Sequence, residues 1–438
     1  MIPLPLLLFG CLFLLLLLGF PVAFTLGGLS LIFGYFTFGL NFFNLLPMRI
    51  WGVMNNVILI AVPLFVYMGA MLQHSGIAEE LLETMALLFG RLRGGLAISV
   101  VVVGALLAAS TGIVGATVVT MGMISLPTML KRGYNPELAT GTITASGTLG
   151  QIIPPSIVLV LLGGVLNVSV GEMFMGAMIP GLILVGLYIV WIIIVALIKP
   201  EAAPSMPDSE LEEFQGKAMI RRIFKAFLPP FFLILAVLGS IFAGIASPTE
   251  AAAVGALGAT LLTLLHRKLT YATLTAVMKS TTHLTSMVFI ILVGATAFGL
   301  VFRGIGGDRY LANLVLEAGL GPNAFLLLVM AIVFIAGFFI DFIEITFIIV
   351  PVVAPLFVQM NISLLWFAIL MAMNLQTSFL TPPFGFSLFY LKGVAPKAIT
   401  TGHIYRGIIP YVIIQLIGLF ITYQFPQTVH WLPGVILK

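Results

Sequence analysis

Charged residues are scarce in this chain. Lysine and arginine together number 19, and aspartate and glutamate 15, so only 8% of the 438 residues are charged. In a soluble globular protein the charged share is about 25%. Hydrophobic residues make up 61% of the chain. This composition excludes a soluble domain and predicts an all-α polytopic membrane protein.

Residue patterns that carry enzymatic chemistry are also missing. The single cysteine, Cys11, excludes a disulfide framework and a cysteine metal site. The five histidines are far apart, and we find no nucleophile with a base at one depth. The glycine groupings fit neither a P-loop nor a dinucleotide fingerprint, and the basic residues form no stripe for nucleic acid. We therefore expect no enzyme, no organic cofactor and no nucleic-acid partner, and an energy source such as an ion gradient.

The stretch NLQTSFLTPPFGF, residues 374–386, interrupts a long apolar segment. Pro382 and Pro383 lack amide protons and their rings clash with the preceding turn, so a helix must break there. The break leaves Gln376 and Thr381 beside free backbone groups. Polar backbone at membrane depth is tolerated only where protein or a water-filled cavity satisfies it. The stretch therefore predicts a binding site within the membrane.

A second stretch, TASGTLGQIIPPS at residues 144–156, repeats this pattern around Pro154 and Pro155. The two proline pairs lie 382 − 154 = 228 residues apart, about half the chain. Interrupted apolar segments in corresponding halves are typical of inverted-repeat transporters, whose substrate and ions bind between the repeats. Two ordinary proline kinks would explain either stretch alone, but not their matching positions and flanks.

Two further apolar segments, residues 94–130 and 321–359, are interrupted by polar residues near 110–112 and 337–344. Each piece is shorter than the roughly 20 residues that a full crossing needs. We therefore expect two re-entrant helical hairpins in addition to the two broken transmembrane helices. Tips and breaks can then meet near the midplane, where half-helix N-termini suit a carboxylate and unwound carbonyls suit a hard cation such as sodium.

A polar segment at residues 199–222, with three prolines and five acidic residues, divides the halves. We expect a surface linker there, partly helical near residues 209–218. In the second half, an interfacial helix at 269–279 should precede a separate span at 284–302. The other predicted full spans cover residues 4–18, 22–40, 56–72, 171–198, 223–245, 250–265 and 404–425. The expected parts are scaffold spans at 1–93, a transport half at 94–168, a connection at 169–222, scaffold spans at 223–320, a second transport half at 321–393 and a last span at 394–438.

The distribution of basic residues orients this topology. Ten full crossings and two hairpins place both termini on one side, and 15 of the 19 basic residues then fall in loops on the other side. Cytoplasmic loops carry the excess of lysine and arginine. The termini are therefore expected outside, and the two halves are expected to be inverted relative to each other. The basic residues left on the termini side are Arg49, Arg303, Arg309 and Lys438.

Four charged residues are candidates for specific roles. Asp341 lies in an apolar surround at the second hairpin tip, where a charge is costly unless it faces a partner or an ion. Glu344 follows on the same helical face, and the alternative for both is solvation at the membrane surface. Glu250 opens a helix, and we expect it to stabilise that helix start together with a neighbouring hydroxyl. Arg303 ends a span and either binds a substrate carboxylate or anchors the helix at the interface.

In order along the chain, TASGTLGQIIPPS, SPTEAAAVGA, GFFID and NLQTSFLTPPFGF resemble motifs of the large membrane subunit of tripartite ATP-independent periplasmic (TRAP) transporters, the DctM type. The resemblance covers essentially the whole chain. It implies a sodium-coupled secondary transporter of the bacterial inner membrane that imports an organic acid by an elevator mechanism. It also implies two partners, a small membrane subunit of the DctQ type and an extracytoplasmic substrate-binding protein of the DctP type.

The resemblance also assigns residues, since each family position can be matched to this sequence. One sodium site joins the first tip to the first break, and another joins the second tip to the second break. The implied sodium ligands are Ser110, Thr111, Gly150, Ile153 and Pro155 at the first site and Gly337, Asp341, Thr381 and Phe384 at the second. The implied substrate contacts are Ser169, Arg303 and Asp341. Ile113 stands where some relatives have a serine, so backbone carbonyls should dominate the first site.

Two other functions fit the same motifs. One is a sodium-coupled anion transporter that works without a binding protein, and the other is a channel. The substrate is not specified, because monocarboxylates, dicarboxylates, keto acids and sugar acids all suit such a site.

Overall fold

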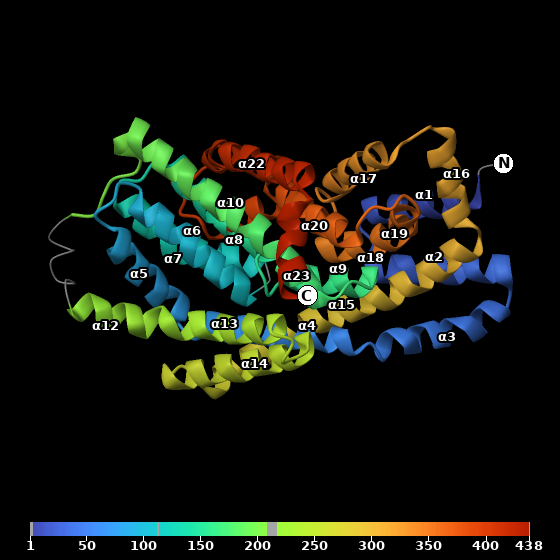
Figure 1. Cartoon of the computed structure of the whole chain (residues 1–438), viewed down its shortest axis with the longest axis horizontal. Coiled ribbons are helices and arrows are strands. Elements are labelled where there is room, and N and C mark those ends of the chain that lie inside the picture. Colours follow the sequence, from blue (N-terminus) through green and yellow to red (C-terminus); the bar gives the residue numbers. More distant parts are fainter. Residues whose placement is uncertain (1–2, 112–113, 208–216, 438) are drawn as a thin grey trace.

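The computed structural model describes residues 3–111, 114–207 and 217–437, with side chains placed except at 108–111 and 217–220. Within these ranges the regular elements are helices and no strand occurs, which confirms the all-α class (Figure 1). The helices of the first half are α1 (Leu4–Leu17), α2 (Val22–Phe38), α3 (Asn41–Met54), η1 (Val57–Ile60), α4 (Ala61–His74), α5 (Ile77–Phe89), α6 (Gly95–Thr111), α7 (Val114–Lys131), α8 (Pro136–Thr148), η2 (Leu149–Gln151), α9 (Ile157–Leu166) and α10 (Val170–Ile198). After η3 (Pro200–Ala202) come α12 (Lys217–Ala226), α13 (Leu228–Phe242), α14 (Pro248–Leu265), α15 (Tyr271–Gly304), α16 (Gly307–Glu317), α17 (Pro322–Ala336), α18 (Phe342–Ile348), α19 (Val350–Gln359), α20 (Leu364–Leu380), α21 (Phe386–Val394), α22 (Thr401–Gln424) and α23 (Gln427–Ile436).

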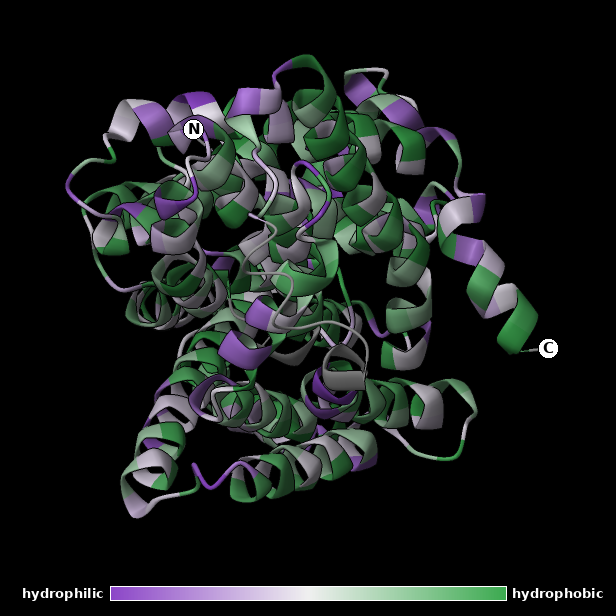
Figure 2. Cartoon of the chain, turned by 90° about the vertical axis from the view of Figure 1, so that its left-hand side faces the viewer, coloured by the Kyte–Doolittle hydropathy of each residue, from purple (hydrophilic) through white to green (hydrophobic). Residues whose placement is uncertain are grey.

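The outer surface of the helices is apolar. Six helices among the described residues are long and apolar enough to cross a membrane, or eight if each bent helix pair counts as one span. Large apolar side chains point outward, including Phe36 at 82% and Leu197 at 76% exposure. Figure 2 shows hydrophobic residues over most of the helices, with hydrophilic residues in short stretches of helices and of the segments between them. Such a surface is stable against lipid tails and unfavourable in water.

Local polar groups set where several helices begin. The Asn135 side chain accepts hydrogen bonds from the amides of Glu137 and Leu138 at 2.8 and 3.2 Å, and so caps α8. At α14 the Ser247 hydroxyl accepts from the Glu250 amide, and the Glu250 carboxylate accepts from the Ser247 amide at 2.7 Å. This reciprocal pair is a capping box, and it confirms the structural role predicted for Glu250.

Two helical hairpins are present, one in each half. At the base of the first hairpin, the amide of Leu96 in α6 donates to the hydroxyl of Tyr134, just after α7, at 3.3 Å. At the base of the second, the rings of Phe325 in α17 and Phe357 in α19 have centroids 5.1 Å apart. The intervening α18 is bent by 51° from α19. Figure 1 shows α6 and α7 toward the left end of the molecule and α17 and α19 toward the right end, so the hairpins enter from opposite ends.

The two broken helices form the centre of the molecule. Helix α8 passes through η2 and restarts as α9, and α20 restarts as α21 after a non-helical stretch. Both breaks contain the predicted proline pairs, and the Pro154-Pro155 and Pro382-Pro383 peptide bonds are both cis. All residues from Leu138 to Thr148 in α8 are buried. The sequence prediction of two interrupted helices is therefore confirmed.

The prediction of two separate helices at 269–279 and 284–302 is wrong. The structure has one continuous helix, α15, of 34 residues. Residues 280–283 (Ser-Thr-Thr-His) are polar but contain no proline or glycine to end a helix. The corresponding stretch of the first half, α3 to α4, is interrupted at η1, where the Asn56 side chain accepts from the Ile58 amide at 3.0 Å. The two stretches correspond in position, because α15 begins 271 − 41 = 230 residues after α3 begins and ends 304 − 74 = 230 residues after α4 ends.

The first part of the linker is packed rather than lying free on the surface. The Gly94 amide donates to the Ala203 carbonyl and the Asn135 amide to the Ala202 carbonyl, both at 2.9 Å. Ala203 has 0% exposure and Met206 7%. This segment therefore joins the base of the first hairpin to the start of α8, because its backbone satisfies amides that no helix pairs.

Other predicted boundaries also change. The span predicted at 223–245 is divided at Phe227, because Pro229 and Pro230 follow in the first turn of α13. A further helix, α23, follows the last span after Pro426 and was not predicted. The helix predicted near 209–218 falls mainly outside the described residues. Of that stretch only the beginning of α12 is described.

Candidate functional site

The second hairpin tip lies directly on the second break. Gly337, at the end of α17, approaches α20 so closely that a Cβ atom there would overlap the Oγ atom of Ser378. The ring of Phe339 lies 5.2 Å from that of Phe384, between centroids. Glycine permits this approach without displacing the Ser378 side chain, so the tip packs directly against α20 just before the break.

Two carboxylates lie at this tip. Asp341 is the N-cap of α18, and its Oδ1 accepts from the Phe342 amide at 2.7 Å. Glu344 completes a capping box, since its Oε2 accepts from the Asp341 amide at 3.2 Å. None of the ion pairs between described residues includes either carboxylate. Two neighbouring acidic groups thus share one helix start without a basic partner.

This capping corrects one part of the predicted chemistry. We expected the half-helix N-termini at the tips and breaks to suit a substrate carboxylate, but the start of α18 is occupied by Asp341 and Glu344. Helices α9 and α21 have no side-chain cap, because Ser156 and Gly385 at their N-cap positions make no such bond. The start of α7 adjoins residues outside the described ranges. Two half-helix starts are therefore seen to lack a competing side chain.

The second break also presents hydroxyl and carbonyl oxygens. The Thr381 hydroxyl donates to the Thr377 carbonyl at 2.8 Å, so its own lone pairs remain directed away from that bond. Gly385 donates its amide to the Thr381 carbonyl at 3.1 Å. Phe384 is half exposed and contributes its backbone to the loop. Oxygen atoms of this kind are the ligands that hard cations prefer.

The first break is likewise a non-helical loop that is closed by a hydrogen bond between a hydroxyl and a backbone carbonyl. Gly150 lies in η2, and Ile153 and Pro155 lie in the non-helical stretch that follows. The Ser156 hydroxyl donates to the Gln151 carbonyl at 2.8 Å, which closes the loop. The structure places Ser110 and Thr111 in the last turn of α6 but does not describe their side chains. The residue predicted to interrupt this hairpin, Gly112, lies outside the described residues.

The first hairpin packs tightly on the first broken helix. A Cβ atom on Gly104 of α6 would lie 2.6 Å from the Cβ of Ser146, and one on Gly147 would lie 2.5 Å from Cγ2 of Val118 in α7. Both arms of the hairpin therefore contact α8 at backbone distance. The described arms of the first hairpin are therefore held directly against α8, the helix that leads into the first break.

A buried polar network joins the broken helices to the spans that follow them. The Thr377 hydroxyl donates to Gln415 Oε1 at 3.1 Å, and Gln415 Nε2 donates to the Tyr188 hydroxyl at 2.6 Å. The Thr142 and Tyr411 hydroxyls share a hydrogen bond of 2.6 Å. The side chains of this network are all fully buried. A satisfied network of this kind fixes the relative position of α8, α10, α20 and α22.

Arg303 faces a separate cavity of about 720 Å³. The cavity lies between α3 and α15 on one side and α9, α18 and α19 on the other, and Arg49 lines it together with Arg303. Arg303 Nε donates to the Gly299 carbonyl at 3.2 Å. Neither arginine takes part in an ion pair between described residues, and no acidic residue lines the cavity. Two arginine side chains without an acidic neighbour in the described lining make this cavity suitable for an anion.

The structure does not bring all three predicted substrate contacts into this cavity. Ser169 is the exposed N-cap of α10, and Asp341 lies at the second tip. Neither lines the cavity, although Asn167, two residues before Ser169, does. Of the three predicted substrate contacts, Arg303 alone is therefore part of the described lining of this cavity.

The sequence matches the family described as the tripartite ATP-independent periplasmic transporter, DctM component, over residues 9–428. The C4-dicarboxylate TRAP transporter large permease protein DctM of Pseudomonas aeruginosa is 33% identical over 390 residues, which cover 89% of each chain. The chain belongs to the DctM family. The sialic acid TRAP transporter large permease protein SiaM of Vibrio cholerae is 30% identical over 427 residues, covering 97% of each chain.

A solved structure shares the fold of this DctM-family chain. The YdaH transporter of Alcanivorax borkumensis matches with a TM-score of 0.60 over 95% of this chain and 98% of that chain, at 14% identity. Family membership confirms the resemblance found in the sequence, and it makes this chain a large permease subunit of a TRAP transporter rather than an enzyme.

Sequence reasoning missed Arg49 in this DctM-family chain. The sequence analysis counted Arg49 only among the basic residues of the termini side. The sequence carries one usable signal, since a single arginine stands among apolar residues 55 − 49 = 6 residues before the break at Asn55. Its position opposite Arg303 depends on the packing of α3 against α15, which no local pattern shows.

Proposed function

We propose that this DctM-family chain couples sodium entry to the import of an organic acid. The observation that carries the proposal is the pair Asp341 and Glu344, two carboxylates that have no basic partner among the described residues and that lie beside the broken helix α20. An acidic pair that is partly buried in an apolar surround is costly unless a cation neutralises it. Carboxylate, hydroxyl and carbonyl oxygens around one point suit sodium, which would be carried as cargo with the acid.

The proposed sodium sites follow the two tip and break pairs. At the second, Asp341 would supply charge, and the Thr381 hydroxyl with backbone oxygens of Gly337 and Phe384 would complete the shell. At the first, backbone oxygens of Gly150, Ile153 and Pro155 would act with Ser110 and Thr111. The close contacts of Gly337 with α20 and of Gly104 with α8 support both, because they hold each hairpin against its broken helix.

The organic acid would bind between the two arginines and the edges of the breaks. Arg303 and Arg49 offer two unpaired guanidinium groups in one cavity, and such groups bind carboxylates through paired hydrogen bonds. Ser169 and the free starts of α9 and α21 would then contact the acid from the transport half. C4-dicarboxylates and sialic acid, for which two relatives are named, both contain carboxylate groups, in agreement with this chemistry.

Transport would follow an elevator mechanism in the bacterial inner membrane, with both termini outside. Each hairpin would move with its broken helix, since their backbones interlock. The scaffold would stay in place through contacts such as Gly255 of α14, where a Cβ atom would lie 2.6 Å from Met68 Sδ of α4. A small membrane subunit and a substrate-binding protein of the TRAP type would complete the transporter.

The proposal is tested by uptake into proteoliposomes that contain the large subunit, the small subunit and the binding protein. Labelled succinate and sialic acid would be supplied with an inward sodium gradient, or with potassium in place of sodium. We expect saturable uptake of at least one acid only with sodium and the binding protein. Equal uptake in potassium would overturn the coupling to sodium. Equal uptake without the binding protein would instead indicate the stand-alone transporter.

A further inference from the structure

A second cavity lies at the end of the molecule opposite Arg303, between α8, α10 and α22. Its volume is about 270 Å³. One wall is a stripe of α10 formed by Trp191, Ile194, Val195 and Ile198. These positions follow the i, i+3, i+4, i+7 spacing, so they lie on one face of the helix. The cavity is thus a groove that runs along α10.

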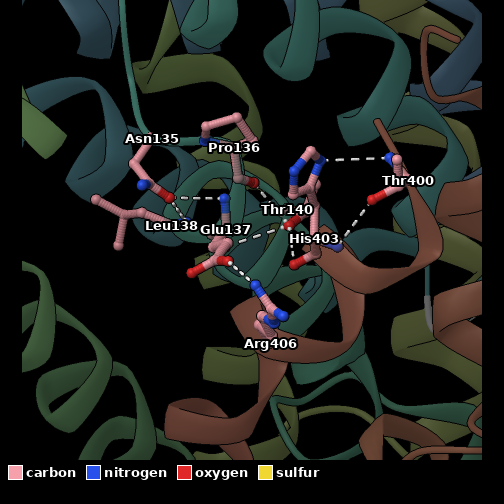
Figure 3. A network of polar contacts seen from close by, with 8 residues as sticks. All are labelled: Asn135, Pro136, Glu137, Leu138, Thr140, Thr400, His403 and Arg406. Carbon is pink, nitrogen blue, oxygen red and sulfur yellow. Dashed lines mark hydrogen bonds and ion pairs between the residues drawn. The ribbon is translucent and has the colours of Figure 1, made fainter. Parts of the chain in front are cut away.

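The groove is basic at one end. Lys199, the C-cap of α10, and Arg406 of α22 both line it. Glu137 of α8 lies 3.8 Å from Arg406, between Nη1 and Oε1, and Figure 3 shows this pair beside the cap of α8. One negative charge thus faces two positive charges. Among the described lining residues this end of the groove therefore has a net positive charge, and the Arg406 side chain is 77% exposed.

The rest of the groove is open to the lipid. Ile194 is 40% exposed and Ile198 72%, on a helix whose composition places it in the membrane. From Trp191 to Lys199 the groove extends about 12 Å along α10, at 1.5 Å per residue. Tryptophan is enriched at the depth where headgroups meet acyl chains. The groove therefore has an apolar wall at the depth of the acyl chains and a basic end at the depth of the headgroups.

We propose that this groove binds an anionic phospholipid such as phosphatidylglycerol. The phosphate would lie between Lys199 and Arg406, and an acyl chain would lie along Trp191, Ile194 and Ile198. Basic pockets between transmembrane helices bind anionic headgroups, and apolar walls continuous with the bilayer hold their chains. A free anion would use only the basic end, whereas a zwitterionic lipid would gain little from the net positive charge.

The bound lipid would stabilise the packing of α10 against α22. Helices α10 and α22 each follow a broken helix, and the groove has a wall on both. A lipid that contacts both spans stabilises their packing by mass action, because it binds the folded protein only. This binding site is independent of the sodium and organic acid sites, which involve none of its lining residues.

The test uses the purified full-length large subunit after detergent removal of lipid. Retention of added phosphatidylglycerol and phosphatidylcholine is counted by native mass spectrometry, and the thermal unfolding shift is measured with each lipid. The variants are Lys199→Ala, Arg406→Ala and the double variant, with Lys199→Arg as the conservative change. Lys397→Ala is the matched control, since Lys397 is exposed at the same end but does not line the groove.

We expect each alanine variant to weaken phosphatidylglycerol binding about fivefold and the double variant roughly 25-fold, from the usual contribution of one basic residue near an anionic headgroup. Lys199→Arg and Lys397→Ala should bind like the unchanged protein. Equal binding by the double variant, or equal retention of phosphatidylcholine, would overturn the proposal. Displacement of the lipid by millimolar inorganic phosphate would reassign the basic end to a free anion.

Discussion

Gln376 Nε2 donates a hydrogen bond to Thr148 Oγ1 at 3.3 Å, although 228 residues separate them. The same interval separates Pro154 from Pro382. Gln376 and Thr148 are thus corresponding positions of the two halves. Corresponding positions of a two-fold repeat can touch only near the axis that relates them. The two breaks therefore lie side by side in the centre of the molecule, as an inverted-repeat transporter requires.

This central hydrogen bond should couple the two halves energetically. In a double-mutant cycle of Gln376→Met and Thr148→Val we expect an interaction of about 1 kcal/mol in unfolding free energy, the usual net value of one hydrogen bond. The measurement is thermal unfolding of the purified chain in detergent. Additive effects of the two substitutions would show that the bond does not contribute.

Asp341→Asn should abolish sodium stimulation of uptake while the protein still inserts and folds. Asparagine caps a helix about as well as aspartate, so the start of α18 is retained and only the charge is removed. The measurement is uptake with sodium and with potassium in proteoliposomes, together with thermal unfolding. Glu250→Gln is the matched control, because Glu250 belongs to a capping box at the exposed start of α14. Sodium-stimulated uptake by the Asp341 variant would remove Asp341 from the coupling site.

Gly337→Ala should impair transport by separating the second tip from α20. The new methyl group would overlap the Ser378 hydroxyl, and overpacking of this kind costs about 1–3 kcal/mol. Adding Ser378→Ala removes the hydroxyl and should restore part of the activity and of the thermal stability. Gly239→Ala in α13 is the control, since a Cβ atom there meets nothing within 4 Å. An unchanged uptake rate in the single variant would contradict close docking of the tip.

Arg303→Ala and Arg49→Ala should each raise the KM for the transported acid with little effect on the sodium requirement. A hydrogen bond to a charged group contributes about 1.5–3 kcal/mol, which corresponds to a KM increase of roughly 10-fold to 150-fold. Lysine at either position should restore part of the affinity, because it keeps the charge but not the planar fork. The kinetics are measured at saturating sodium with the acid that the unchanged transporter carries.

Arg309→Ala provides the comparison for the two cavity arginines. Arg309 lies on α16, the helix that follows Arg303 in the chain. Its side chain is exposed and does not line the cavity. Its substitution should leave KM unchanged. A KM increase equal to that of Arg303→Ala would indicate a general loss of positive surface charge rather than direct binding.

Much of the fold could be predicted because its signals are local. The breaks at Pro154 and Pro382 follow from missing amide protons and ring clashes, which depend on adjacent residues alone. The capping role of Glu250 follows from a hydroxyl three residues earlier. The error at residues 280–283 has a local cause too, since polar residues were taken as a boundary although none of them ends a helix.

The composition and the proline pairs by themselves determined that this chain spans a membrane and interrupts two helices within it. Only the tertiary structure decided that Arg49 lies across a cavity from Arg303, that Asp341 and Glu344 occupy the start of α18, and that Ala202 and Ala203 satisfy amides of the first hairpin and α8. The physical reason is the distance in sequence over which each interaction acts. A proline acts on its own turn, whereas a cavity or a shared hydrogen bond depends on which distant helices pack together.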